Sequence, residues 1–244
     1  AVSAEARAVQ DRNVALVEKR RADTEAATAT AITDFLQGDV LAQASVSAQA
    51  RPDTKADPDL KVRTALDRAA TRIAGKFDAQ PLVEASVRQT IGNTYKALGL
   101  YPEAQQQLER ALDLQGRVLG ARHPDRLSTM NNLAEIYWSQ GRYDRAKPLF
   151  VEALEARRRL LGDAHRDTLT TMNDLAALHW SQGQYAEAEP LYTKALEGMR
   201  RVAGADHPDT LGTMNNLALL YRTQGKPAQA VSLYNAALDG RRRT

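Results

Sequence analysis

The chain of 244 residues is 43% hydrophobic and 26% charged, enough for one large or two small folded units, which argues against wholesale disorder. It contains no cysteine, so disulfides, thiolate zinc sites and cysteine nucleophiles are excluded. Its 33 basic residues nearly balance 30 acidic ones, so the net charge of +3 gives little reason to expect nucleic acid as a partner. No stretch approaches the roughly 20 apolar residues that span a bilayer.

The first predicted element is one long charged helix over residues 3–37, which Gly38 ends. Its apolar residues are sparse, and the mixed charges from Glu18 to Arg21 predict a solvated face, with a stalk or coiled-coil linker as the alternative. Residues 45–57 are rich in Ser, Asp, Lys and Pro and predict a loop. Residues 1–57 are therefore predicted to be a linker. Because the chain begins at Ala1 and has no signal-peptide run, we interpret it as part of something longer.

The rest of the chain repeats itself every 42 residues. Three histidines keep this step, at His123, His165 and His207. A period of 20–50 residues is typical of a solenoid of stacked supersecondary units. We divide this part, residues 58–244, into a degenerate half repeat and four repeats, at 58–76, about 82–119, 124–161, 166–203 and 208–244.

Each copy contains two helical patterns. In the second copy, Gly141 is predicted to end the first helix and Gly162 the second. His-Pro-Asp at 123–125 supplies an extended residue before proline and then an acidic residue for the next helix N-terminus. One helix pair cannot bury its apolar face alone, so the sequence predicts an all-α fold of stacked pairs. The apolar residues at helical spacing in this copy are Leu127, Met130, Leu133, Ala134 and Tyr137, then Ala146, Leu149, Phe150, Ala153, Leu154, Leu160 and Leu161.

The small and aromatic residues of this copy carry a resemblance to the tetratricopeptide repeat. The 42-residue step and the segments HPDT and NNLA resemble its kinesin light chain subclass. The resemblance covers roughly residues 82–244. It implies a right-handed α-α superhelix in which the first helix of each pair lines a concave groove for a protein or an extended peptide. The residues that match are Leu133, Ala134, Tyr137, Gly141, Tyr143, Ala146, Phe150 and Ala153.

A second resemblance covers roughly residues 24–119. The segments AITDFLQGDVLAQAS, LKVRTALDRAATRI and IGNTYKALGLYPEA are similar to the region between kinase and repeats in bacterial serine/threonine kinases with a C-terminal repeat array. This resemblance implies that the chain is the interaction or sensor part of a larger bacterial signalling protein.

The sequence offers little for catalysis. His165-Arg166-Asp167 looks like a kinase catalytic loop, but that motif requires an asparagine where Met172 stands, and Asn173 is one residue too far. Sister copies have His-Pro-Asp here, so we assign these residues to a helix-start turn. Neither His-Glu-x-x-His nor a Gly-x-Ser-x-Gly elbow occurs. We expect no enzyme activity, no metal and no cofactor.

The polar side of each first helix carries the predicted binding residues, which helical spacing turns away from the partner helix and the core. An asparagine can pair with the backbone of an extended peptide, and a tryptophan suits a binding anchor. In tetratricopeptide repeats the asparagine matched by Asn132 and Asn216 often clamps ligand backbone, a pattern from which Asp174 departs. The predicted groove residues are Gln89, Asn93 and Lys96 in the first copy, Asn131, Asn132, Glu135 and Trp138 in the second, Asn173, Asp174 and Trp180 in the third, and Asn215, Asn216 and Arg222 in the fourth.

Other interpretations of these residues stay open. The asparagines could bridge neighbouring helices and the tryptophans could pack between repeats, which would make the array a structural self-assembly module. The arginine clusters at 157–159, 200–201 and 241–243 are assigned to the dipoles of the second helices, with a nucleic-acid patch as the weaker alternative. The sequence shows no further repeat and no polar capping helix after the last copy, so we expect Tyr234 to be partly exposed. We then expect either end-to-end self-association or a natural protein that continues with further repeats.

Overall fold

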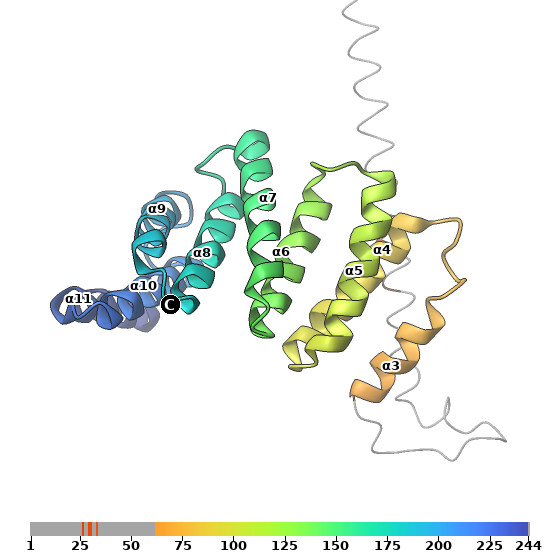
Figure 1. The fold of residues 1–244 in the computed structure, drawn as a ribbon, viewed down its shortest axis with the longest axis horizontal. Helices are drawn as coiled ribbons and strands as arrows, with labels where there is room; N and C mark the ends of the chain where they lie inside the picture. Colours follow the sequence, from red (N-terminus) through yellow and green to blue (C-terminus); the bar gives the residue numbers. More distant parts are fainter. Residues whose placement is uncertain (1–25, 27–28, 31–32, 34–61, 244) are drawn as a thin grey trace, which may run out of the picture.

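The computed structural model describes residues 26, 29, 30, 33 and 62–243. Between residues 62 and 243 it contains nine helices and no strand, stacked side by side in chain order along an arch (Figure 1). The predicted all-α fold is therefore confirmed. The long helix predicted over 3–37 falls mostly outside the described residues, although the four described there are helical, and the loop predicted at 45–57 lies outside them entirely.

Eight of these helices form four consecutive antiparallel pairs, and one further helix precedes them. That first helix, α3, packs against α4. Its assignment to a degenerate half repeat stays a prediction. Its Leu66 and Ala69 are buried against α4. The bounds are α3 Val62–Arg72, then the pairs α4 Pro81–Ala97 with α5 Tyr101–Val118, α6 Pro124–Ser139 with α7 Tyr143–Leu161, α8 Arg166–Ser181 with α9 Tyr185–Val202, and α10 Pro208–Thr223 with α11 Pro227–Arg243.

The first helices of the last three repeats begin with the same cap. Nδ1 of His123 accepts a hydrogen bond from the backbone N–H of Asp125 at 3.3 Å, and His165 and His207 make the equivalent bond at 3.2 and 3.1 Å. The cap satisfies one of the N–H groups that the first turn leaves without a helical partner. The histidine that marks the repeat in the sequence therefore sets where each first helix starts.

The turn inside each pair depends on glycine. Gly99, Gly141 and Gly183 each follow a first helix with φ of +73°, a left-handed conformation that only glycine adopts at no steric cost. Because this turn recurs unchanged, every second helix leaves its partner in the same direction. The four pairs are thus copies of one unit in geometry as well as in sequence.

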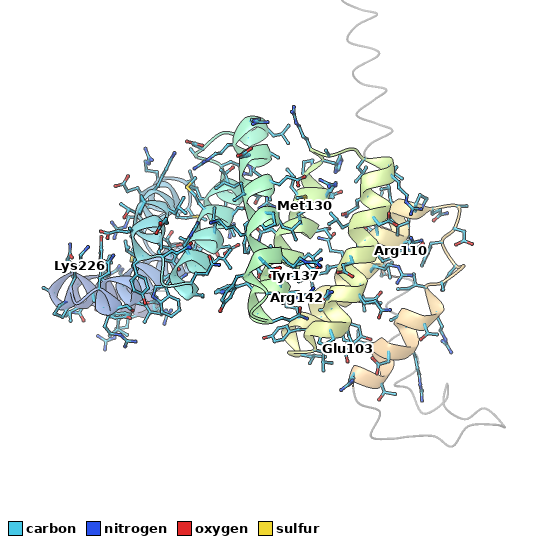
Figure 2. All side chains as sticks on the ribbon, viewed as in Figure 1. Glu103, Arg110, Met130, Tyr137, Arg142 and Lys226 are labelled. Carbon is cyan, nitrogen blue, oxygen red and sulfur yellow. The ribbon has the colours of Figure 1, made fainter. Side chains whose placement is uncertain are left out.

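Small residues bring the two helices of a pair together, and large ones fill the space between repeats. Ala146 and Ala188 are fully buried, and so is Phe150. Each first helix is also tied to the second helix before it: the hydroxyl of Tyr137 donates to Glu109 at 2.6 Å. Arg142 stacks over the Tyr137 ring, 4.7 Å from its centroid, and these two residues lie side by side in Figure 2.

The two sets of helices occupy different sides of the stack. First helices of neighbouring repeats approach each other (α4 with α6, α6 with α8, α8 with α10) more closely than second helices do. The first helices therefore line the inner side of the curve, and the second helices lie outside it. We call the polar side of α4, α6, α8 and α10 the inner surface.

Candidate functional site

All thirteen residues predicted for the groove lie on the inner helices, but their exposure differs. Asn131 is buried, with 5% of its surface exposed, and Arg222 is exposed. The others are half-buried: Gln89, Asn93, Lys96, Asn132, Glu135, Trp138, Asn173, Asp174, Trp180, Asn215 and Asn216. Several of these side chains form hydrogen bonds or ion pairs with neighbouring helices, and others do not.

The joint between the second and third repeats contains two carboxylates around one amide. Nδ2 of Asn131 donates to Oε1 of Glu135 and to Oδ2 of Asp174, both at 2.9 Å. Glu135 also forms an ion pair with Lys96 of α4, with 2.8 Å between Nζ and Oε2. Asn131 and Asp174 are 43 positions apart, so the bond joins α6 to α8.

The joint between the third and fourth repeats has a related bond between two amides. Nδ2 of Asn216 donates to Oδ1 of Asn173 at 3.1 Å, and Nδ2 of Asn173 lies 3.3 Å from Oδ1 of Asp174. A continuous polar chain therefore runs from Lys96 on α4 to Asn216 on α10. Asn131, Asn173 and Asn216 thus bridge neighbouring helices, which is the alternative that the sequence left open for them.

The two tryptophans also connect consecutive repeats. Nε1 of Trp138 donates to Oγ of Ser181 at 2.9 Å, and Nε1 of Trp180 lies 3.4 Å from Oγ1 of Thr223. The Trp138 ring packs against the apolar clusters on both sides of its joint, and Trp180 packs against one. The expectation that these rings lie away from the core is therefore wrong, because the inner helices are close enough for an indole to reach the next repeat.

Five predicted groove residues keep their polar groups free of the rest of the fold. These side chains make no hydrogen bond or ion pair to any described residue: Gln89, Asn93, Asn132, Asn215 and Arg222. Asn132 and Asn215 are half-buried amides on α6 and α10, so their donors and acceptors remain for a ligand. The Oδ1 atom of Asn93 is buried and accepts no hydrogen bond from a described residue.

The electrostatics of the inner surface centre on Asp174. Burial, together with the negative charge of Glu135, raises the pKa of Asp174 to about 7. Hydrogen bonds from Asn131 and Asn173 and the charge of Lys96 oppose this shift without cancelling it. Ionisation of Asp174 is therefore less favourable than that of an ordinary aspartate, a property that the sequence did not reveal.

One arginine of the clusters at the ends of the second helices is not a surface residue. Arg157 is 5% exposed, and its guanidinium donates to Oγ1 of Thr171 at 2.6 Å, to the carbonyl of Asp167 at 3.1 Å and to Oγ of Ser128 at 3.0 Å. Burial lowers the pKa of this guanidinium. Its assignment to the helix dipole was incomplete, because the side chain turns inward and ties α7 to α6 and α8.

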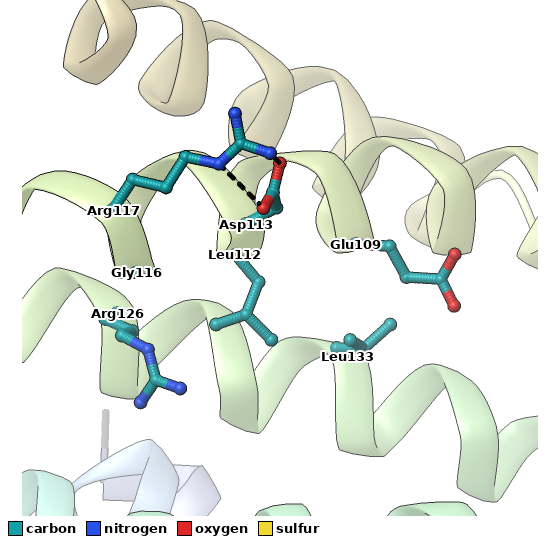
Figure 3. A pocket seen from close by; sticks show the side chains of 7 residues that line it. All are labelled: Glu109, Leu112, Asp113, Gly116, Arg117, Arg126 and Leu133. Atoms are coloured by element: carbon teal, nitrogen blue, oxygen red, sulfur yellow. Dashed lines mark hydrogen bonds and ion pairs between the residues drawn. The ribbon is translucent and has the colours of Figure 1, made fainter. Parts of the chain in front are cut away.

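Two open cavities lie between second and first helices, away from the inner polar chain. Seven residues line the first, of about 430 Å³, including Leu112 of α5 and Leu133 of α6 (Figure 3). The second, of about 480 Å³, has Leu196 and Leu217 at the equivalent repeat positions. Since the same geometry recurs two repeats apart, these cavities are products of the repeat rather than one specialised site. They provide a natural control for binding experiments.

Within residues 62–243, no group of three or more His, Cys, Asp or Glu side chains is arranged to hold a metal ion. None of the described helices combines the length and the apolar character that crossing a membrane requires.

An array of helix pairs with this cap, glycine turn and period defines an α-solenoid. A family model described as Tetratricopeptide repeat matches residues 83–159, 128–200 and 167–243, which together span more than half of the chain. The chain belongs to the tetratricopeptide repeat family, whose members are generally non-catalytic scaffolds for protein interaction.

Solved structures show the same fold at low sequence identity. BtubC (BKLC) from P. vanneervenii has a TM-score of 0.64 at 20% identity, covering 93% of this chain and 91% of that one. A Podosopora anserina protein with nearly identical TPR-like repeats of the kinesin light chain type has a TM-score of 0.62 at 20% identity, covering 90% of this chain and 94% of that one. MamA has a TM-score of 0.52 at 17% identity, covering 74% and 91%.

The predicted repeat family and its kinesin light chain likeness are confirmed by these matches. No curated protein matches the chain. The resemblance of residues 24–119 to the segment beside a bacterial kinase has no counterpart among these matches and stays a prediction.

Proposed function

We propose that the chain is a non-catalytic scaffold that binds an extended peptide or protein segment along its inner surface. The observation that carries this proposal is the pair of half-buried amides, Asn132 and Asn215, that no described residue engages. An amide in this state can donate to and accept from a peptide backbone whatever its side chains are. The half-buried ring of Trp138 lies on α6, as Asn132 does, and that of Trp180 lies on α8, between α6 and α10 in chain order, so both offer apolar contact on the inner helices.

The arginine clusters give less support to a nucleic-acid partner. Arg158 pairs with Asp163 at 3.2 Å, and Arg243 pairs with Asp206 at 2.6 Å. Arg157 is buried. Little of this positive charge is left for phosphates, whose neutralisation dominates nucleic-acid affinity. The further placement of the chain within a bacterial kinase-type signalling protein rests on the resemblance of residues 24–119 alone.

The test is a selection of peptides from a random display library on the immobilised chain, followed by affinity measurements on variants. Asn132→Ala and Asn215→Ala should each weaken the selected peptide by about tenfold or more, which corresponds to about 1.4 kcal/mol. Neither change removes a bond within the fold, so thermal unfolding should be unaffected. Gln229→Ala, in the cavity between α9 and α11, is the matched control. If Gln229→Ala abolishes binding and the asparagine variants do not, the inner-surface assignment is wrong.

A further inference from the structure

The joint between the second and third repeats differs from the next joint in one chemical respect. Its inner bond joins the Asn131 amide to the carboxylate of Asp174, whereas the next joint pairs two amides, Asn173 and Asn216. The repeat position of Asp174 carries asparagine in both flanking copies, Asn132 and Asn216. The substitution of one oxygen for an NH₂ group makes this joint, unlike its neighbour, able to gain and lose a proton.

A second carboxylate stands beside the first. Because one Nδ2 group of Asn131 reaches both Glu135 and Asp174 at 2.9 Å, the two carboxylates are held close to each other. Like charges at such separations oppose simultaneous ionisation. Lys96 pairs with Glu135 on the side of α4, so Glu135 is the carboxylate with a direct cationic partner. Within the described residues, Asp174 accepts hydrogen bonds from two amides, those of Asn131 and Asn173.

The other groups that face Asp174 do not offset the repulsion between its carboxylate and that of Glu135. The charge of Arg157 on α7 interacts favourably with the carboxylate, but its guanidinium bonds to Thr171 and Ser128 instead. Tyr192 of α9 also faces Asp174, and burial together with that carboxylate raises the pKa of its hydroxyl, so the phenol stays neutral near neutral pH. The ionised form of Asp174 is thus held by two amides but has no directly bonded cation.

We propose that the joint between the second and third repeats is a proton-controlled hinge of the solenoid. With Asp174 protonated, Asn131 holds α6 and α8 in the arrangement described. With Asp174 ionised, repulsion from Glu135 weakens the inner contact, and the two repeats separate on that side. The bond from Trp138 to Ser181 crosses the same joint, so the indole responds to the change.

The direction of the pH dependence follows from the shift of the carboxyl group. The pKa of Asp174 in the fold is about 7, above the ordinary value of 3.8. The folded joint therefore binds the proton more tightly than the open chain does, and the stabilisation is complete below pH 3.8. This stabilisation is lost as the pH rises through about 7. Above that pH, Asp174 causes no further change in stability.

The chain contains only two tryptophans, one at each joint, which provides a matched pair of reporters. In Trp180→Phe, the fluorescence of Trp138 reports the hinge. In Trp138→Phe, the fluorescence of Trp180 reports the amide joint. We expect the first variant to titrate with a midpoint near pH 7 and the second to stay flat over that range. A flat trace from Trp138, or equal titration at both joints, would overturn the proposal.

Variants in the Trp180→Phe background identify the titrating group. Asp174→Asn should abolish the transition and should fold, because asparagine occupies this position in the flanking repeats. Glu135→Gln should move the midpoint to lower pH and Lys96→Gln to higher pH, since their charges act on Asp174 in opposite directions. Histidines also titrate near neutrality in general, and His179 lies in α8, so His179→Gln is the control. A transition that survives Asp174→Asn, or disappears in His179→Gln, would contradict the hinge.

The ¹³C carboxyl resonance of Asp174 gives an independent measurement on the unsubstituted chain. We expect it to titrate near pH 7, and a midpoint below pH 5 would refute the proposal. The hinge needs no ligand, so its failure would leave the peptide-binding proposal untouched, and a failed peptide selection would leave the hinge untouched.

Discussion

Helices α9 and α11 are the same element in consecutive repeats, yet one is covered and the other is not. The alanines that face their own first helices are equally buried, with Ala188 at 0% and Ala230 at 2% exposed. On the outward side, Leu196 is 4% exposed and its counterpart Leu238 is 48% exposed. The alanine contact inside the repeat is therefore closely similar in the two helices, and the marked difference lies on the side that faces the next repeat.

The cover on α9 comes from α10. Leu211, Met214 and Leu217 of α10 share one apolar cluster with Tyr192 and Leu196 of α9. No described residue plays this role for α11, whose Tyr234 is half-buried, as expected from the sequence. In a solenoid, stability is the sum of terms within repeats and terms between neighbours. Because α9 has a following repeat and α11 has none among the described residues, comparing them separates the contribution within a repeat from the contribution between repeats.

The largest difference is expected from truncation of the outward leucine. Leu196→Ala should lower the free energy of unfolding by about 2–5 kcal/mol, because it removes buried methyl groups and leaves a cavity. Leu238→Ala should change it by less than about 0.5 kcal/mol, since the side chain is already half exposed. Urea unfolding followed by circular dichroism measures both. Equal losses would mean that α11 is covered in solution, and the comparison would then fail.

The repeat architecture could be predicted because it depends on spacing alone. Residues such as His123, Gly141 and Ala146 recur at a fixed step, and each serves a local purpose: a cap, a turn, a close contact. Such local geometry is encoded within a few residues of the chain. The described residues accordingly form the all-α stack that this spacing predicts.

The candidate site could be predicted only in part. Periodicity places Asn131 and Asp174 on the same side of successive helices, but not their relative heights. The bond between them joins residues 43 apart, one more than the period, and the bond from Asn216 to Asn173 has the same step. Asn132 stands at the repeat position of Asp174 and Asn216, but the residue 43 before it is Gln89, which makes no such bond. Which of these positions are joined therefore depends on the contacts at each joint, which no single repeat could reveal.

Substitutions at the contact inside each repeat should affect α9 and α11 equally, in contrast to the leucine truncations. Ala188→Leu and Ala230→Leu should both destabilise the chain by about 1–3 kcal/mol, because each overpacks the contact within its own repeat. Thermal unfolding of the two variants gives the values. If Ala230→Leu were neutral while Ala188→Leu was costly, α11 would be loosely attached to α10, and exposure of its outward side would not be the only difference.

A smaller effect is expected at the start of the helix that covers α9. His207→Ala should cost about 1 kcal/mol, because the N–H of Asp209 loses the acceptor that caps α10. His207→Asn should keep most of the stability, since asparagine caps well. Amide hydrogen exchange in the first turn of α10 is the direct measurement. Unchanged exchange in His207→Ala would show that the cap does not stabilise the first turn of α10. Loss of the cap would then not expose the side of α9 that α10 covers.

The smallest effect on stability, but a clear one on association, is expected at Val231. Its counterpart in α9 is Glu189, which accepts hydrogen bonds from Gln224 and Lys226 of the next repeat, both at 3.0 Å. On α11 the same position is an exposed valine, 55% accessible. Val231→Glu should therefore leave the unfolding free energy within about 0.5 kcal/mol, because no neighbour is lost or gained.

The same change should still weaken self-association, because a charge would interrupt the exposed apolar stripe that Val231 forms with Leu238. The exposed Arg68 of α3 is charged, so that part of α3 offers no apolar match for the stripe. We expect association to join two copies of α11 rather than α11 to α3. Sedimentation over a concentration series is the measurement, with Arg68→Ala as the control on α3. Equal weakening by both variants would favour a head-to-tail contact, and no self-association in the unsubstituted chain would mean that the exposed stripe is tolerated as it stands.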